Sequence, residues 1–189
     1  MGTRSSTGLI IKGEYKASYN QLNGYPGGVG QEMVDVCKSI IDWDKFKKHA
    51  EKLQPITNGT APTPEQIKMY ESITNLGVSE QSTSDWYCLL RKAQGGELFR
   101  LIYEGKIKHI LDSSDFIKDS LFCEYAYIIN LDSMEFEVYK GFQKEPQPGN
   151  KFGELPDNLG YYPCKLIKTF PLNKIPDDWG EQSFPGKIN

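Results

Sequence analysis

The chain has 189 residues, of which 38% are hydrophobic and 25% charged, and its net charge at pH 7 is -3. A domain of roughly 150 residues already buries about two thirds of its unfolded surface, so this length supports one hydrophobic core better than two. The acidic balance excludes the basic surplus of duplex nucleic-acid binders, and no stretch approaches the roughly 20 apolar residues of a membrane span. We therefore expect one soluble domain over residues 1–189, without a duplex or membrane partner.

The cysteines and the N-terminus indicate a cytoplasmic protein. Cys37, Cys88, Cys123 and Cys164 lie far apart without CxxC pairing, which favours reduced thiols over disulfides or a zinc site. Residues 1–6 carry one arginine and no apolar core behind it, so they do not form a secretory signal.

The N-terminal part of the chain is predicted to form a hairpin, a glycine-rich turn and a helix. Residues 2–11 are rich in β-formers, residues 12–14 supply a turn and residues 15–21 supply the returning strand. Turn formers and glycines dominate residues 23–30. Apolar residues then recur at helical spacing over residues 29–40.

The helical middle spans about residues 29–105. A second helix is expected over residues 43–53, where Phe46, Ala50 and Leu53 share a face. Further helices are expected over residues 63–76, 84–92 and 97–103, and their starts are marked by a capping residue, a proline or a glycine pair. Residues 54–63 contain two prolines and an Asn-Gly pair, which predict an exposed loop.

The C-terminal part returns to strands. Residues 122–131 and 135–142 predict a second hairpin, residues 143–160 a long loop and residues 161–170 one more strand. Prolines and glycines punctuate residues 171–189, so this tail is expected to lie irregularly along the surface. Strands at both ends with helices between them predict an α+β fold, with an antiparallel or mixed sheet covered by the helical middle.

The glycine-rich turn is the strongest local signal for a ligand. Gly27, Gly28 and Gly30 precede a helix, where backbone N–H groups can converge on an anion and the helix dipole favours negative charge. An equally simple reading is a tight strand-to-helix connection that needs positive φ. Tyr19 and Tyr25 lie close enough in sequence to stack on a base or ring.

Arg4 is the one charge in the first strand. It is either an outward-facing residue or an anion ligand with a planar, bidentate fork.

No motif indicates a cofactor, a metal or a catalytic centre. His49 and His109 are isolated, and the chain has no phosphate-loop or dinucleotide fingerprint. One enzymatic alternative is an N-terminal-nucleophile hydrolase, in which removal of the first methionine bares a Cys, Ser or Thr. Here position 2 is Gly2, and Thr3 or Ser5 could serve only after further trimming.

The opening Met1-Gly2-Thr3-Arg4-Ser5, with Asn23-Gly24-Tyr25-Pro26 and the glycines after it, resembles a family of small bacteriophage and bacterial proteins. Members open with MGTRS or MATRS and carry a DGYP-like turn before the first helix. Residues 127–139 are similar to that family's second hairpin. The N-terminal motifs lie within residues 1–30, and Asn23 replaces the usual Asp, which removes a charge there.

This resemblance implies a function in immune evasion. Some phage proteins of this architecture are anti-CBASS sponges, which are oligomeric, non-enzymatic proteins that sequester cyclic dinucleotides such as cyclic GMP-AMP. It implies that Arg4 and the glycine turn face phosphates while tyrosines stack on bases. The predicted ligand-binding residues are Thr3, Arg4, Ser5, Tyr19, Asn23, Tyr25, Gly27, Gly28 and Gly30.

Our leading hypothesis from sequence is a phage-encoded homo-oligomer that captures a nucleotide signal without cleaving it. The alternatives are an N-terminal-nucleophile-like or nucleotide-cleaving hydrolase and a protein-binding inhibitor of a host factor.

Overall fold

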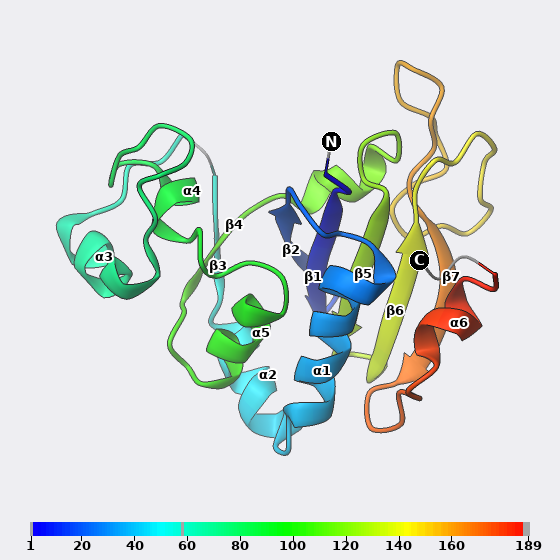
Figure 1. Ribbon diagram of the computed structural model, residues 1–189, viewed down its shortest axis with the longest axis horizontal. Coiled ribbons are helices and arrows are strands. Elements are labelled where there is room, and N and C mark those ends of the chain that lie inside the picture. The colour runs from blue at the N-terminus through cyan, green and yellow to red at the C-terminus, as the bar shows by residue number, and fades with distance from the viewer. Residues whose placement is uncertain (1, 58, 187–189) are drawn as a thin grey trace.

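The computed structural model describes residues 2–57 and 59–186, so Met1 and the last three residues of the predicted tail lie outside it. Its centre is a five-stranded sheet in the order β2-β1-β5-β6-β7 (Figure 1). Strand β1 is parallel to β5, and the other neighbours are antiparallel. The α+β prediction with a mixed sheet is therefore confirmed. The strands are β1 (Ser5–Ile11), β2 (Glu14–Asn20), β5 (Tyr125–Asn130), β6 (Glu135–Lys140) and β7 (Lys165–Pro171).

Both predicted hairpins are present, and a carboxylate joins their turns. The β1–β2 turn has Lys12 at φ 52° and Gly13 at φ 74°, the left-handed pair that suits a two-residue hairpin. Asp132, in the β5–β6 turn, accepts hydrogen bonds from the backbone N–H groups of Lys12 and Gly13 at 2.7 and 2.8 Å. The two hairpins are thus fixed to each other at this end of the sheet.

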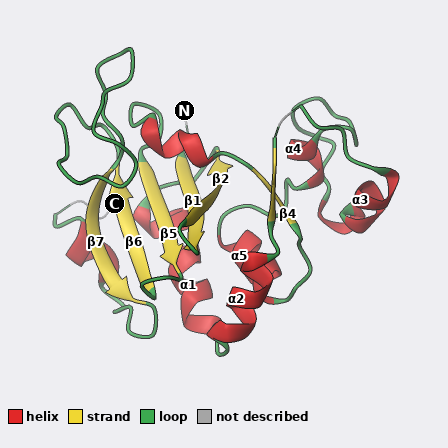
Figure 2. Cartoon of the chain, turned by 180° about the vertical axis from the view of Figure 1, so that it is seen from behind, coloured by secondary structure: helices red, strands yellow, loops and turns green. Residues whose placement is uncertain are grey.

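Four helices pack against one face of the sheet (Figure 2). They are α1 (Gln31–Ser39), α2 (Trp43–Glu51), α5 (Gly96–Tyr103) and α6 (Trp179–Ser183). Alternate strand residues such as Leu9, Tyr127 and Phe136 face them and form the larger core. The buried ammonium of Lys16 donates to the carbonyls of Ala50 and Leu53 at the end of α2, which ties that helix to the edge of the sheet.

The opposite face is covered by a 3₁₀ helix, Ser114–Lys118, and by the loop between β6 and β7. Ile10, Ile128 and Tyr139 point to this side and form a smaller core with Cys123 and Cys164. The loop is anchored through a buried carboxylate. Glu137 accepts hydrogen bonds from Asn130, Tyr139 and Lys151 at 2.6 to 2.7 Å.

A helical lobe projects beside β2 (Figure 1). It contains α3 (Pro64–Met69), α4 (Trp86–Leu89) and a parallel pair of short strands, β3 (Gln54–Ile56) and β4 (His109–Leu111). The helix predicted to start after Thr63 does so, with a capping box between Thr63 and Gln66. It ends at Met69 instead of residue 76, and the predicted 54–63 loop contains β3.

The irregular surface tail predicted after residue 171 is wrong for most of its described length. Leu172, Ile175, Trp179 and Phe184 are buried in the larger core, and α6 carries Trp179 onto the sheet. Burial of these four apolar side chains fixes the tail against the core, although only Trp179 of the four lies in a helix.

Candidate ligand-binding site

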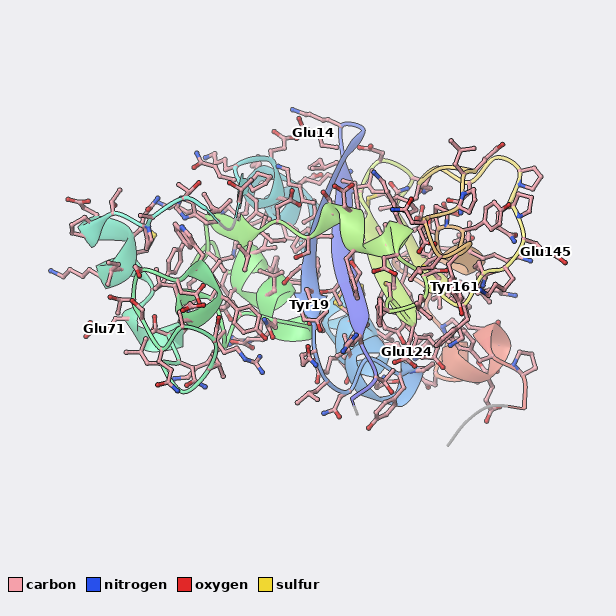
Figure 3. The ribbon with its side chains drawn as sticks, turned by 90° about the horizontal axis from the view of Figure 1, so that it is seen from above. Glu14, Tyr19, Glu71, Glu124, Glu145 and Tyr161 are labelled. Atoms are coloured by element: carbon pink, nitrogen blue, oxygen red, sulfur yellow. The ribbon has the colours of Figure 1, made fainter. Side chains whose placement is uncertain are left out.

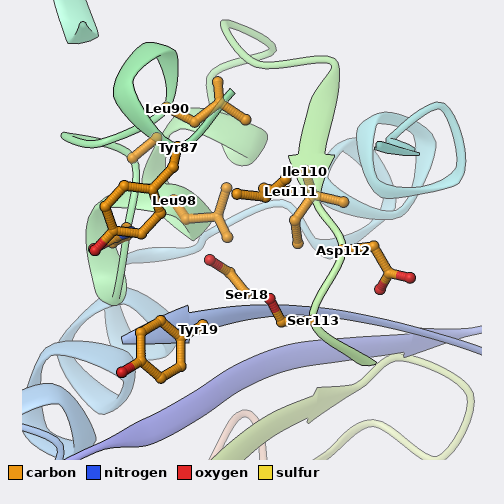
Figure 4. Close-up of a pocket in the computed structure, with 11 residues that line it drawn as sticks. Ser18, Tyr19, Tyr87, Leu90, Leu98, Ile110, Leu111, Asp112 and Ser113 are labelled. Carbon is orange, nitrogen blue, oxygen red and sulfur yellow. The ribbon is translucent and has the colours of Figure 1, made fainter. Parts of the chain in front are cut away.

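A cavity of about 170 Å³ lies between strand β2, the residues around α4 and the end of β4 (Figure 4). Antiparallel pairing positions β2 along the sheet edge, and the segment after β4 crosses it through a hydrogen bond from the Ser113 N–H to the Ala17 carbonyl at 2.9 Å. The cavity is lined by Ser18, Tyr19, Tyr87, Leu90, Ala93, Gln94, Leu98, Ile110, Leu111, Asp112 and Ser113.

The cavity walls are apolar with a few hydroxyl groups. Leu90, Leu98 and Ile110 are buried and form the inner wall. The Ser18 hydroxyl is directed into the space in Figure 4, and it hydrogen-bonds to none of the described residues. A flat ring with one polar edge suits such walls, because its faces meet apolar side chains while its edge meets a hydroxyl.

Tyr19 and Tyr87 stand on two sides of the cavity (Figure 4). The Tyr19 ring packs edge-on against Phe116 at 4.9 Å between centroids, and its hydroxyl donates to the side chain of Gln21. Burial raises the pKa of the Tyr19 phenol above its ordinary value, Arg4 opposes this and Tyr87 adds to it. Ser6 of β1 pairs with Tyr19 of β2, so Arg4, two residues before Ser6, lies near the Tyr19 end of the cavity without lining it.

Two of the chain's three arginines lie near this cavity without a carboxylate partner among the described residues. Arg100 is bound by Glu97 and Glu104, each at 2.5 Å. By contrast, the Arg4 guanidinium lies 5.2 Å from the centre of the Phe122 ring, and that of Arg91 lies 5.7 Å from the centre of the Tyr87 ring. A guanidinium left uncompensated beside aromatic rings is a good receptor for a phosphate.

A second, smaller hollow of about 140 Å³ shares Gln94 with the first. Arg91 lines it, donates to the Gln94 side chain and keeps a buried Nε without a hydrogen-bond partner. Asn23 lines the same hollow. The two hollows together provide aromatic walls on one side of Gln94 and an arginine on the other.

The glycine-rich turn does not offer the predicted anion site. The N–H groups of Gly28 and Gly30 point to the carbonyl of Tyr25, and that of Val29 donates to the Asn23 carbonyl at 2.7 Å. Positive φ occurs at Asn23, at 56°, whereas Gly27, Gly28 and Gly30 all lack it. The turn is therefore a tight strand-to-helix connection, which was the other interpretation of the sequence. The residue in the left-handed conformation is Asn23 and not a glycine.

The glycines at positions 28 and 30 are needed for close packing. A Cβ at Gly28 would lie 2.2 Å from the carbonyl oxygen of Asn23, and one at Gly30 would lie 2.7 Å from the Trp179 ring. The turn, Pro26–Gly30, is a short π-helical segment that leads directly into α1.

The other predicted residues have structural partners or lie elsewhere. The Thr3 carbonyl accepts the Gly24 N–H at 2.9 Å, the Ser5 hydroxyl is buried without a partner, and Tyr25 is 40% exposed outside both hollows. Of the predicted set, Tyr19 lines the first hollow and Asn23 the second, while Arg4 lies near Tyr19 but lines neither hollow. Tyr87, Arg91 and Gln94 were not predicted.

The two histidines are engaged away from the cavity. His49 Nδ1 lies 3.0 Å from the Ile102 carbonyl, and His109 Nδ1 lies 2.6 Å from the Tyr70 hydroxyl. Among residues 2–57 and 59–186, no three His, Cys, Asp or Glu side chains gather as a metal site would require.

No family model, curated protein or solved structure matches this chain. In the part of the chain that the structure describes, no helix combines the length and apolar character needed to cross a membrane.

Proposed function

We propose that the protein binds a nucleotide-derived signal, such as cyclic GMP-AMP, and holds it unchanged in the cytoplasm of a phage-infected host, which blocks the host's defence. The observation that supports this proposal is the cavity between Tyr19 and Tyr87, with Arg4 and Arg91 beside it and unpaired with any described carboxylate. Aromatic side chains accept a base by stacking, and arginine accepts a phosphate through paired hydrogen bonds.

The size of the cavity limits what enters it. Sites for whole drug-sized ligands occupy roughly 300 to 1,000 Å³, so a cavity of about 170 Å³ holds one heterocycle and leaves the rest of the ligand outside. Arg91 lines the adjacent hollow, which shares Gln94 with the cavity, and is the arginine placed to meet that remainder.

The surroundings of the histidines favour binding over cleavage. His49 and His109, the residue type most often used for general acid–base catalysis, are hydrogen-bonded to a backbone carbonyl and to a tyrosine, and neither lines the cavity. A nucleotide in the cavity therefore meets hydroxyl, amide and guanidinium groups.

The direct test is retention followed by recovery. Purified protein is incubated with a panel of cyclic dinucleotides and cyclic ADP-ribose isomers, filtered, heated and analysed by chromatography. We expect one nucleotide to be depleted from the filtrate and recovered intact after heating. A chemically changed product would instead identify a hydrolase, and a panel left undepleted would direct attention to a protein partner.

A matched pair of arginine variants tests the site itself. Arg91→Gln removes the guanidinium beside the cavity and should weaken nucleotide binding about tenfold or more, since hydrogen bonds to charged groups contribute about 1.5 to 3 kcal/mol. Arg100→Gln removes the arginine that is already paired with two glutamates and should leave affinity within about twofold. Equal effects of the two substitutions on titration calorimetry would place the site elsewhere.

A further inference from the structure

Three aromatic side chains lie in the turns near the end of the molecule where β5 begins and β6 ends. We call Phe122, Phe142 and Tyr161 the aromatic row. In the view of Figure 3, Tyr19, Glu124 and Tyr161 lie in succession across this end. Phe122 and Phe142 are 44% and 50% exposed, which is unusual for phenyl rings in turns.

Each ring of the aromatic row has a cation beside it. The Arg4 guanidinium lies 5.2 Å from the centre of Phe122, the Lys140 ammonium 5.6 Å from that of Phe142 and the Lys144 ammonium 3.2 Å from that of Tyr161. Arg4 and Lys144 form no ion pair with a described carboxylate. Lys140 also lies 3.7 Å from the centre of the Tyr125 ring. Each ring of the aromatic row therefore has a positive charge within about 6 Å.

Backbone hydrogen bonds hold the turns that carry these rings together. The Phe142 N–H donates to the Ser120 carbonyl at 2.7 Å, and the Gln143 N–H donates to the Ser120 hydroxyl at 3.1 Å. Gln143 then forms an isolated antiparallel bridge with Tyr162. The spacing of the rings is therefore fixed by main-chain contacts.

Phe142 adopts a backbone conformation that a phenylalanine rarely takes. Its φ is 59°, in the left-handed region, and the preceding Gly141 is so close to the chain that a Cβ there would lie 2.0 Å from the Cys123 carbonyl oxygen. Such a conformation costs on the order of 1 to 3 kcal/mol and persists where the surroundings determine it. Glycine would fit this backbone better, and yet an exposed aromatic ring occupies it.

We propose that the aromatic row and its cations form a binding track for single-stranded nucleic acid. Each nucleotide of a single strand offers one base and one phosphate, and a ring with a cation beside it can accept both, the base by stacking and the phosphate by charge. A duplex keeps its bases stacked inside and cannot use the rings. The track goes beyond the proposed function: it shares Arg4 with the proposed nucleotide site, but Tyr87 and Arg91 of the cavity do not belong to it.

Two acidic residues, Glu124 and Glu145, lie close to the track in the sequence, but neither forms an ion pair with Arg4 or Lys144 among the described residues. Glu124 accepts a hydrogen bond from the backbone N–H of Arg4 at 3.2 Å and forms no ion pair with its guanidinium. Glu145 is exposed in the loop beyond Lys144. A phosphate can therefore reach Arg4 from the solvent side.

The test is fluorescence anisotropy with a labelled oligothymidylate dodecamer at about 50 mM and about 200 mM salt. We expect binding that weakens as salt rises and at least tenfold weaker binding of a duplex of the same length. Phe142→Gly should weaken oligonucleotide binding about tenfold, since one stacked base contributes that much or more. The same variant should melt no lower than the parent protein, because glycine relieves the positive φ.

Two further variants distinguish the track from general charge and from the cavity. Lys144→Gln should weaken oligonucleotide binding, whereas Lys48→Gln, on α2 at the other end of the sheet, should leave it unchanged. Tyr87→Leu should also leave it unchanged while nucleotide binding in the cavity is lost. Absence of oligonucleotide binding at low salt, equal binding of the duplex, or full binding by Phe142→Gly would each overturn the track, whatever the outcome at the cavity.

Discussion

At the scale of single residues, the glycine-rich turn shows how one sequence pattern serves two purposes. Glycines before a helix permit an anion site, but they also permit another group to approach the backbone closely. Here the aromatic rings of Tyr127 and Trp179 occupy the space next to Gly30, and the Tyr127 hydroxyl donates to the Gly24 carbonyl at 3.0 Å. Those rings come from the C-terminal half of the chain, so the sequence pattern alone could not distinguish the two uses.

A pair of glycine substitutions tests this explanation. Gly30→Ala places a Cβ 2.7 Å from Trp179 and 2.8 Å from Tyr127, and we expect it to lower the free energy of unfolding by about 1 to 3 kcal/mol. Gly27→Ala meets its nearest atoms, in Tyr25, at 3.9 Å and should change stability by less than about 0.5 kcal/mol. Urea denaturation of both variants checks the contrast, and similar losses would show that the turn needs glycine for another reason.

At the scale of secondary-structure elements, local signals predicted the hairpins and most helix starts. The capping residues Thr63 and Asp85 and the break at Gly95 each act within one turn of chain, so the sequence reveals them. Strands β3 and β4 are very short and pair in parallel although α3 and α4 lie between them in the sequence, so no periodicity could indicate them. The tail was missed for a different reason, because its turn formers masked its core positions.

The burial of the C-terminal tail leads to a prediction about stability. Trp179 is 2% exposed, contacts the rings of Tyr127 and Phe136, and donates from its indole N–H to Gln31 at 2.9 Å. Trp179→Ala should therefore cost about 3 to 5 kcal/mol of stability. Leu159→Ala, at a side chain that is 63% exposed, should cost less than about 0.5 kcal/mol. Thermal and urea unfolding would measure both losses. A loss of less than about 1 kcal/mol in Trp179→Ala would mean that the tail lies loosely on the surface.

The helical lobe provides a prediction about pH. Burial lowers the pKa of His109 below its ordinary value of 6.5, and the charge of Lys108 adds to this. A histidine whose folded-state pKa is depressed contributes stability that is present above the unfolded pKa and is lost as pH falls through the folded value. We expect the free energy of unfolding to decrease as pH falls below about 6.5.

Replacement of the histidine tests the origin of this pH dependence. His109→Gln should make stability less sensitive to pH below neutrality. Unfolding curves collected at several pH values would check this. A parent-like slope in His109→Gln would assign the effect to other groups.

At the scale of the whole molecule, the candidate site joins segments that the sequence keeps apart. Tyr19 was predicted because it lies near the glycine turn, and Arg4 because it is the one charge in a strand. Tyr87 and Arg91 belong to a distant segment of the helical middle that carries no motif. They reach the cavity because the lobe packs along β2, and this packing depends on tertiary contacts that no local pattern encodes.

The lobe and the sheet should also differ in local stability. Helix α3 contains no buried residue, whereas every residue of β1 is buried and the strand is paired on both sides. We expect the backbone amides of α3 to exchange with solvent much faster than those of β1, because local opening exposes little apolar surface there. Hydrogen exchange with mass spectrometry would measure this, and equal protection would mean that lobe and sheet open as one unit.

The parallel pairing of β1 with β5 has a consequence for synthesis. Ser5 pairs with Tyr125, so β1 leaves the ribosome long before β5, the middle strand of the sheet and its second neighbour. At roughly 5 to 20 residues per second, β1 waits on the order of ten seconds for β5. During that time it is paired only with β2 and presents an open, apolar edge to other chains. Nascent chains that stall before residue 125 are therefore the species most prone to aggregate.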